Sequence, residues 1–322
     1  MVVKMSKDKD GVVEQPGKIV LSGASGMLGT ALLGALRVRG TPLVRLVRTQ
    51  IRGEATAESG QSMLHWNPAA TPAIKNPAAL EGCAAAVHLS GASVAGHRWT
   101  PAYKQEVAAS RVDSTRALAT VLAGLKRPPR TLVVASAVGI YGDRGDELLD
   151  ESSAPGTGFL AEVCQRWEEA ALPAEEAGIR VVHARFGVVL GRGPGALEKM
   201  LPVFRLGLGG RLGSGRQWMS WISVDDVVGA IQFALETEAL AGAVNFVSAN
   251  PVTNAEFTRV LGRVLHRPAV LPVPAFALRL AFGEMADEAL LASALVAPAK
   301  LIAAGFRFAH PGLEDALASA LK

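Results

Sequence analysis

Short apolar runs alternate with longer amphipathic stretches through the first two-thirds of the chain. The runs predict buried strands, at 19–21, 42–47, 84–89, 131–135 and 180–190, with one more core strand at 244–247. The stretches predict helices, at 30–38, 101–125 and 158–177, with a further helix at 253–265 and a helical C-terminus. Because strands and helices alternate with short links, the pattern favours an α/β fold in which helices cover both faces of a parallel sheet.

Residues 18–29 have the pattern of a strand that runs into a phosphate-binding glycine turn. Gly23, Gly26 and Gly29 follow a G-x-x-G-x-x-G spacing between the first strand and the first helix. A pyrophosphate must approach the backbone closely there, and the helix N-terminus offers free N–H groups and a partial positive charge. Glycines can fall into this spacing by chance in a chain with 34 of them, but the strand–helix context favours dinucleotide binding over an ordinary tight turn. The expected contacts of this turn with the cofactor are Gly23, Ala24, Ser25, Gly26, Met27 and Leu28.

The sequence changes character at Gly191, after which Gly, Pro and Arg dominate through Gly215. We therefore expect a doubly wound parallel sheet of the Rossmann type and a smaller, mostly helical C-terminal substrate domain assembled from two separated segments. The predicted division is a disordered lead-in at 1–17, a cofactor domain at 18–190 plus 222–248, and a substrate domain at 191–221 plus 249–322.

The end of the second strand indicates which dinucleotide is bound. A cofactor with a free ribose 2′-hydroxyl usually meets an acidic side chain there, but no Asp or Glu occurs between Gly29 and Glu54. Arg48 stands at that strand end, where a guanidinium can fork onto a 2′-phosphate. The sequence therefore predicts NADP(H) in preference to NAD(H). For the neighbouring Arg37, Arg39 and Arg52, a solvated surface position is the simpler interpretation.

The composition excludes several classes of function. The chain has 322 residues, of which 49% are hydrophobic and 19% charged, so it can bury a large core. A net charge of +4 and only 5% aromatic residues give no basic stretch interleaved with aromatics, so no nucleic-acid partner is expected. Cys83 and Cys164 are too isolated for a disulfide framework, and the six histidines show no metal-ligand spacing.

The N-terminal segment lacks the apolar region of a secretory signal, and no stretch is apolar for long enough to span a bilayer. We therefore expect a soluble, cytoplasmic protein with no membrane partner. The expected partner is a small-molecule substrate that could carry a phosphate, and the expected state is a monomer or homodimer.

Several segments match the motifs of one superfamily. They are LSGASGMLG (21–29), LVR (46–48), HLSGASVAGHRWT (88–100), SRVDST (110–115), SAVGIYG (136–142), CQRWEEA (164–170), RFGVVLG (185–191), LGSGRQWMSWISVDD (212–226), NFVSANPVTNAEFT (245–258), FGEMA (282–286) and AGFRF (304–308). Through them the chain resembles the extended, epimerase-like short-chain dehydrogenases/reductases. More closely, it resembles their atypical epimerase-family branch, which ends in a C-terminal domain of unassigned function. By position, the resemblance implies further cofactor contacts at Leu89, Ser90, Gly91, Ala135 and Val189.

The catalytic positions depart from this resemblance. Extended members use a Tyr-x-x-x-Lys pair, in which the lysine lowers the tyrosine pKa so that the phenol can exchange a proton. The corresponding segment, 158–168, reads GFLAEVCQRWE and contains neither residue, while Tyr141 occupies a turn position that is usually structural. We expect Ser136, or a water held by Arg111, to replace the missing phenol. The alternative for Ser136 is a simple hydrogen bond at the strand end.

Arg111 stands where extended members carry Asn, so it would bring a fixed positive charge towards the cofactor. Glu106, on the same predicted helix, is expected to line the same cavity and is taken as a further cofactor contact. The alternative for both is an ordinary salt network on the helix surface.

On the substrate side, Arg216 and Trp218 are the candidate binding residues. Arg pairs with phosphate or carboxylate, and Trp offers an apolar face to a sugar or base. The alternative is that Trp218 and Trp221 are buried core side chains where the two domains meet, and that Arg216 pairs with Asp225 or Asp226.

Two functions remain open at this point. One is an NADP-dependent oxidoreductase or epimerase that acts on a small carbonyl or sugar-nucleotide-like substrate without the usual Tyr-x-x-x-Lys pair. The other is a catalytically silent sensor or interaction protein that binds NADP(H), because a hydride transfer without a tuned acid loses a factor of roughly 10²–10⁴.

Overall fold

The computed structural model describes residues 17–49, 56–57 and 61–322, with the backbone alone for 56–57. The predicted lead-in at 1–17 lies outside these residues except for Gly17, and Arg52 also lies outside them.

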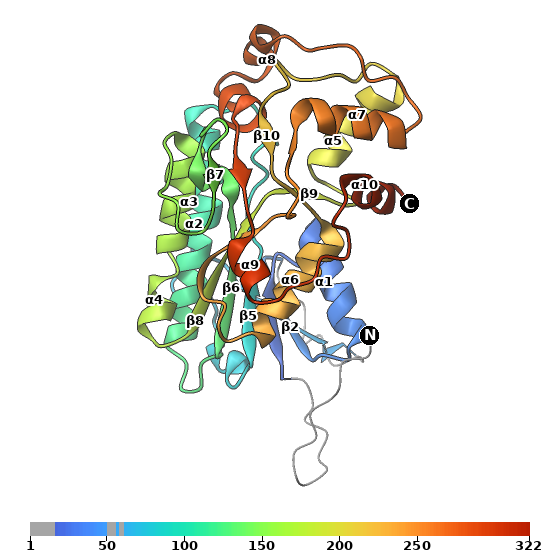
Figure 1. Cartoon of the computed structure of the whole chain (residues 1–322). Coiled ribbons are helices and arrows are strands. Elements are labelled where there is room, and N and C mark those ends of the chain that lie inside the picture. Colours follow the sequence, from blue (N-terminus) through green and yellow to red (C-terminus); the bar gives the residue numbers. More distant parts are fainter. Residues whose placement is uncertain (1–16, 50–55, 58–60) are drawn as a thin grey trace.

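Among the described residues, eight strands form the main sheet, in the order β12–β8–β6–β5–β1–β2–β4–β3. In that order they are Gly242–Phe246, Arg180–Phe186, Thr131–Ala137, Ala85–His88, Ile19–Ser22, Leu43–Val47, Gln61–His65 and Thr56–Ala57. Figure 1 labels β8, β6, β5 and β2 among them. The first seven run parallel, and β3 is antiparallel to β4. The predicted doubly wound parallel sheet is therefore confirmed.

The central strand β1 pairs with β2 on one side and with β5 on the other, so that Ile19 lies opposite both Leu43 and Ala85. The winding of the chain reverses between β1 and β5. In open α/β sheets such a switch point, at the carboxyl ends of the strands, is where ligands bind.

Helices cover both faces of the sheet (Figure 1). Helices α2 (Pro101–Ala123), α3 (Phe159–Glu169) and α4 (Leu172–Glu176) pack together on one face, and α1 (Met27–Val38) packs with α6 (Val224–Glu236) on the other. The largest hydrophobic core lies between these layers, with Leu21, Val87 and Val133 completely buried.

Residues 191–322 supply most of a second lobe. Its helices are α5 (Ala196–Arg205), α7 (Asn254–Val264), α8 (Ala275–Phe282) and α10 (Leu313–Leu321), with a π-helical turn at Ala286–Leu291. Helix α9 (Ala299–Ala303) instead packs against β12 of the main sheet, where Leu301 joins the largest core. The short strands of the lobe are β10 (Trp218–Met219), β11 (Trp221–Ser223), β13 (Val252–Thr253) and β14 (Leu295–Val296), of which β11 pairs with β9 (Val188–Leu190) and β14 with β7 (Leu148–Leu149).

In the part of the chain before residue 191, short 3-10 helices occupy Pro77–Leu80 and Val138–Tyr141.

A separate hydrophobic core, centred on Leu197, Trp221, Phe257 and Leu317, holds the second lobe together. The mostly helical C-terminal part is as expected, while the predicted residue-by-residue domain division stays a prediction.

One strand was missed and two local expectations were wrong. Strand β4 was missed, because only Gln61 of its residues is buried and the apolar signal is weak. The helix expected over 158–177 breaks at Ala170–Ala171 into α3 and α4. The strand expected over 180–190 is interrupted at Gly187, where a Cβ atom would lie 2.5 Å from the Ser220 carbonyl oxygen.

Within the described ranges, no helix combines the length and the apolar character needed to cross a bilayer.

Candidate functional site

The glycine turn after β1 forms a tight corner against the neighbouring backbone. Gly23 has a φ of +72°, and a Cβ atom on it would lie 2.6 Å from the carbonyl group of Leu89 at the end of β5. A Cβ atom on Gly29 would lie 2.1 Å from the Gly23 oxygen. Helix α1 then begins at Met27 with Gly26 as its N-cap; in the part of the chain that the structure describes, no side chain caps it, and its first turn holds no acidic residue. The first N–H groups of α1 are therefore available to an anion. We name this turn, at residues 23–29, the glycine corner.

Neighbouring segments enclose the glycine corner. Leu89, which follows β5, donates its N–H to the Ser22 oxygen over 3.3 Å. The sulfur atom of Met27 lies 3.1 Å from the place where a Cβ atom on Gly191 would sit. Ser90 and Gly91 continue from Leu89, and Ala135 lies buried near the end of β6. Val189 is half-buried in β9, opposite Ile222.

Arg48 comes directly after β2 and is exposed. Within the described part of the chain, its guanidinium makes no hydrogen bond or ion pair. A position at the end of β2 with open N–H groups is what the 2′-phosphate of NADP would need.

Arg111, on α2, is held beside the loop that follows β5. Its Nη2 donates to the Ala92 oxygen over 2.9 Å and its Nη1 to the Val107 oxygen over 3.0 Å. The guanidinium carbon lies 5.1 Å from the ring centroid of Trp167, which is a cation–π contact. Burial lowers the pKa of Arg111, but a guanidinium keeps its charge in proteins. Arg111 is thus a fixed positive charge near the β5 strand end.

Glu106, expected to share a cavity with Arg111, is exposed on α2. No contact joins its carboxylate to Arg111 among the residues that the structure describes.

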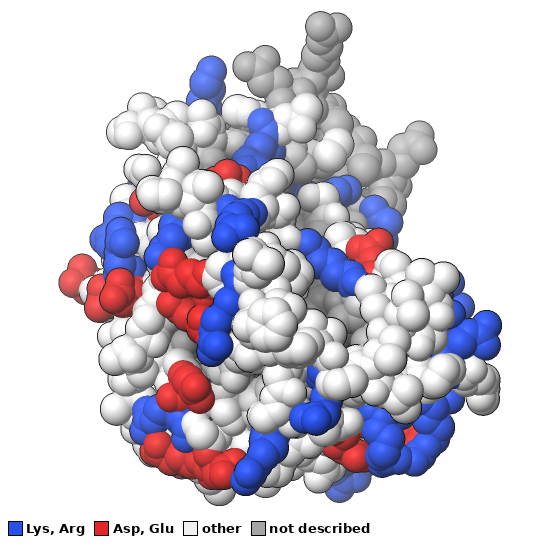
Figure 2. All heavy atoms as spheres, turned by 90° about the horizontal axis from the view of Figure 1, so that it is seen from above, with Lys and Arg blue, Asp and Glu red and all other residues white. Residues whose placement is uncertain are grey.

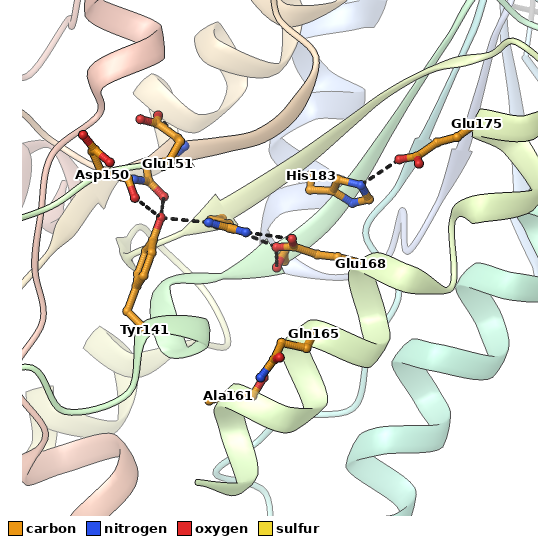
Figure 3. Close-up of polar contacts among 11 residues, drawn as sticks. Tyr141, Asp150, Glu151, Ala161, Gln165, Glu168, Glu175 and His183 are labelled. Carbon is orange, nitrogen blue, oxygen red and sulfur yellow. Dashed lines mark hydrogen bonds and ion pairs between the residues drawn. The ribbon is translucent and has the colours of Figure 1, made fainter. Parts of the chain in front are cut away.

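Ser136 belongs to a buried polar network, and Figure 3 shows Tyr141 and Glu168 of the same network. It is 2% exposed, and its hydroxyl donates to Oε1 of Glu168 over 2.7 Å. Arg185 donates to both oxygens of Glu168, over 2.8 and 2.9 Å, and through Nη1 to the hydroxyl of Tyr141 over 2.9 Å. The Tyr141 hydroxyl lies 2.8 Å from Oδ1 of Asn245 and 2.9 Å from the Asp150 carbonyl oxygen. Figure 3 shows Tyr141 and Glu168 approaching the same guanidinium from opposite sides.

The charges of this network follow from its surroundings. Burial raises the pKa of Tyr141, so its hydroxyl stays protonated. Burial alone would lower the pKa of Arg185, but the hydrogen bonds and charge of Glu168 outweigh it and raise that pKa. Tyr141 therefore fills a structural place at the 3-10 turn. Glu168 and Arg185 were not recognised as site residues from the sequence, although both lie in segments that carry the family resemblance.

Helix α3 holds apolar side chains where the extended enzymes carry Tyr and Lys. The rings of Phe159 and Trp99 meet edge-on, with their centroids 5.0 Å apart. Nζ of Lys104 lies 4.4 Å from the centroid of the Phe159 ring. Cys164 is buried, and this burial, with the nearby charge of Glu168, raises its pKa to about 12. Its thiol is therefore protonated and unreactive at neutral pH.

The N-terminus of α3 is capped from the other lobe. The carboxylate of Glu288 accepts the N–H groups of Phe159 and Leu160, over 2.9 and 2.8 Å. A carboxylate suits a helix N-terminus, because it satisfies free N–H groups and complements the helix dipole.

Among the described residues, Arg216 and Trp218 share no hydrogen bond with this network. Arg216 is exposed, and its guanidinium does not pair with Asp225, which instead contacts His310 at 3.1 Å. Trp218 is half-buried, with its Nε1 donating to Asp146 over 2.8 Å. Trp221 is fully buried in the second core.

Within residues 17–49 and 61–322, no three His, Cys, Asp or Glu side chains gather as metal ligands would. Both cysteines are free and buried.

A seven-stranded parallel sheet in this order, with a glycine corner at its switch point, defines a Rossmann-fold nucleotide-binding protein. The chain belongs to the NAD dependent epimerase/dehydratase family, whose model matches residues 19–246. Residues 273–320 match a domain of unknown function, DUF1731.

Several relatives share nearly the whole chain. The epimerase family protein Mb2239 of Mycobacterium bovis is 46% identical over 299 residues, which are 93% of this chain and 96% of the relative. Human epimerase family protein SDR39U1 is 34% identical over 93% of this chain and 98% of its own length. A crystal structure of human SDR39U1 with NADPH superposes with a TM-score of 0.84, at 33% identity over 94% of this chain and 98% of that one. The predicted resemblance to the epimerase-family branch with an unassigned C-terminal domain is thus confirmed.

Proposed function

We propose that the protein binds NADP(H) at the glycine corner and acts as an oxidoreductase or epimerase on a small carbonyl or sugar-nucleotide-like substrate. The observation that carries the proposal is the corner itself, where Gly23 and Gly29 leave no room for a Cβ atom and the first N–H groups of α1 are uncapped. The human relative crystallised with NADPH supports the same cofactor for this chain. The position of Arg48 directly after β2 supports NADP over NAD.

Calorimetry with the Arg48→Ala variant tests the cofactor assignment. A lost contact between an arginine and a phosphate should weaken NADPH binding by about tenfold or more, while NADH binding should change little. Arg116→Ala, an exposed arginine on α2, is the matched control and should keep wild-type affinity for both. Equal losses for the two coenzymes in Arg48→Ala would refute the 2′-phosphate assignment, and no affinity for either in the wild type would refute the proposal.

When bound, NADP(H) would supply or accept the hydride, and the chain would have to stabilise charge and move a proton. Arg111 would stabilise negative charge on the substrate oxygen, because its guanidinium is already held by Ala92 and Val107 and needs no reorganisation. Ser136 would take the proton of a substrate hydroxyl while its own hydrogen passes to Glu168, with which it already shares a hydrogen bond.

A panel of carbonyl compounds and sugar nucleotides, followed through the oxidation of NADPH, tests turnover. Removal of the hydroxyl in Ser136→Ala should lower kcat by roughly 10²-fold or more if Ser136 moves the proton. Arg111→Gln should lower kcat/KM without lowering NADPH affinity equally. Unchanged rates in both variants would remove these two residues from the mechanism.

The burial of Ser136 favours a second candidate function. Its hydroxyl is already committed to Glu168 and is 2% exposed, and α3 carries no Tyr-x-x-x-Lys pair. A protein with this site could bind NADP(H) tightly and act as a sensor. Tight NADPH binding without turnover on any member of the panel would favour the sensor over the enzyme.

A further inference from the structure

A hollow of about 380 Å³ on the C-terminal lobe is lined by four arginines. They are Arg211, Arg259, Arg263 and Arg267, and small residues such as Ala255, Thr258 and Gly262 complete the lining. None of the glycine-corner residues lines this hollow. We name it the arginine pocket.

Local structure holds the arginines around one space. Arg259 and Arg263 are four residues apart on α7 and therefore share a helix face. Past the end of α7, His266 adopts a φ of 53°, and Arg267 donates its N–H back to the Gly262 oxygen over 2.9 Å. Gly262 allows this turn to close, because a Cβ atom on it would lie 2.7 Å from the Cβ of Ala269.

The fourth arginine comes from the neighbouring segment. Arg211 accepts the N–H of Val273 at its carbonyl oxygen over 2.9 Å, so its backbone is fixed beside the stretch that follows Arg267. Its Nη1 donates to the carbonyl oxygen of Ser214. The four guanidiniums thus come from segments that the fold holds in register.

The pocket carries more positive than negative charge. Glu256 pairs with Arg259 over 3.0 Å, and Glu314 pairs with Arg263 over 3.0 Å. The guanidiniums of Arg211 and Arg267 instead donate to backbone carbonyl oxygens. For example, Nε of Arg267 donates to the carbonyl oxygen of Arg205 over 3.0 Å. Two positive charges are therefore not neutralised by these carboxylates.

We propose that the arginine pocket binds phosphoryl groups of a ligand that carries at least two negative charges. Guanidiniums bind phosphate oxygens through paired N–H groups, and several around one hollow suit a diphosphate or a phosphate monoester. Each arginine has five N–H donors, and the contacts above use only some of them.

The phosphoryl group could come from a dissolved compound or from a lipid headgroup. Val270, which lines the pocket, is 75% exposed, and the neighbouring Leu206 and Leu271 are 73% and 48% exposed. Figure 2 shows, on the face seen from above, broad areas without charged side chains that are bordered by Lys and Arg. An apolar surface beside arginines also suits an anionic bilayer surface. The test therefore includes both sources.

The test uses the full chain saturated with NADP⁺, so that the glycine corner is occupied if it binds the coenzyme. Inorganic pyrophosphate is titrated by calorimetry, and vesicles of phosphatidylcholine with or without phosphatidic acid are used in sedimentation. The test variant is Arg211→Gln with Arg267→Gln. These two arginines contact backbone carbonyl oxygens, so their replacement does not remove the partner of Glu256 or Glu314. The control is Arg116→Gln with Arg130→Gln, two exposed arginines elsewhere that lower the net charge equally.

The test variant should lose about tenfold or more in affinity for the probe that binds, while the control keeps it and both keep NADPH affinity. Pyrophosphate binding lost in the test variant supports a dissolved ligand, and loss confined to phosphatidic acid vesicles supports a headgroup. The proposal is overturned if neither probe binds, or if the test variant binds as well as the control. NADPH affinity is read separately, so failure of the cofactor assignment is distinguished from failure here.

Discussion

The hydroxyl of Ser136 and the carboxylate of Glu168 are joined by a 2.7 Å hydrogen bond. The same carboxylate holds Arg185, whose side chain is 8% exposed. Ser136 therefore has its donor hydrogen already placed, and any chemistry at its oxygen must involve Glu168.

Glu168→Gln should strongly destabilise the fold. The amide keeps the shape but leaves the buried Arg185 without its counter-charge, which should lower the free energy of unfolding by about 3 kcal/mol. Urea denaturation measures the change. Glu169→Gln, at an exposed neighbour on α3, should stay within about 0.5 kcal/mol of the wild type. Equal effects in the two variants would contradict the importance of the buried pair.

Gly29→Ala should damage the glycine corner, because the new Cβ would lie 2.1 Å from the Gly23 oxygen. NADPH binding, measured by calorimetry, should be lost or severely weakened. Gly34→Ala on the same helix is the control, since nothing lies within 4 Å of its Cβ position. This control should keep NADPH affinity and gain about 0.5–1 kcal/mol of stability from helix propensity. Normal NADPH binding by Gly29→Ala would exclude the corner as the cofactor site.

His88 should make the protein less stable in acid. Burial lowers its pKa from 6.5 to about 3, and its ring nitrogens contact Ser22 and Ser114 at 2.6 and 3.1 Å. Between these two pKa values the unfolded chain binds a proton that the folded chain does not. Stability from this group is therefore complete above pH 6.5 and falls as the pH drops towards 3.

The variant His88→Gln isolates this effect. From pH 7 to pH 5, the wild type should lose about 2 kcal/mol more of its free energy of unfolding than His88→Gln does. Urea unfolding at the two pH values gives both numbers. If the two proteins lose the same amount, His88 is not the group responsible.

Glu288→Gln should loosen α3. The variant weakens two charge-assisted hydrogen bonds to Phe159 and Leu160, which should cost about 1–2 kcal/mol. Hydrogen exchange of the first turn of α3 should also speed up. Asp287→Asn is the control, because its ion pair with Arg279 is exposed and should contribute less than about 1 kcal/mol. Unchanged exchange in Glu288→Gln would show that α3 does not depend on this cap.

The glycine corner could be predicted because its signal is local. An apolar strand, spaced glycines and a helix follow one another within residues 18–38, and each requirement is visible in the sequence. Most strands of the main sheet were predicted for the same reason; β1, for example, is buried throughout and consists of three apolar residues followed by Ser22.

The polar network and the cap on α3 could not be predicted in this way. Ser136 and Glu168 are 32 residues apart, and Glu288 is 129 residues from Phe159. Such pairs meet only through strand register and the packing of two lobes, neither of which has a periodic sequence signal. Ser136 was recognised as a candidate, but its partner was not, because Glu168 lies in a helix whose charged residues look like a solvated face.

The cap on α3 also has a consequence for how the chain is made. Of the seven parallel strands, all but β12 lie before residue 187, and α3 ends at Glu169. The carboxylate that caps the N-terminus of α3 belongs to residue 288. On the ribosome, the nucleotide-binding half emerges and can begin to collapse first. The N-terminus of α3, beside the end of β6, therefore lacks its cap until nearly the whole protein has been synthesised.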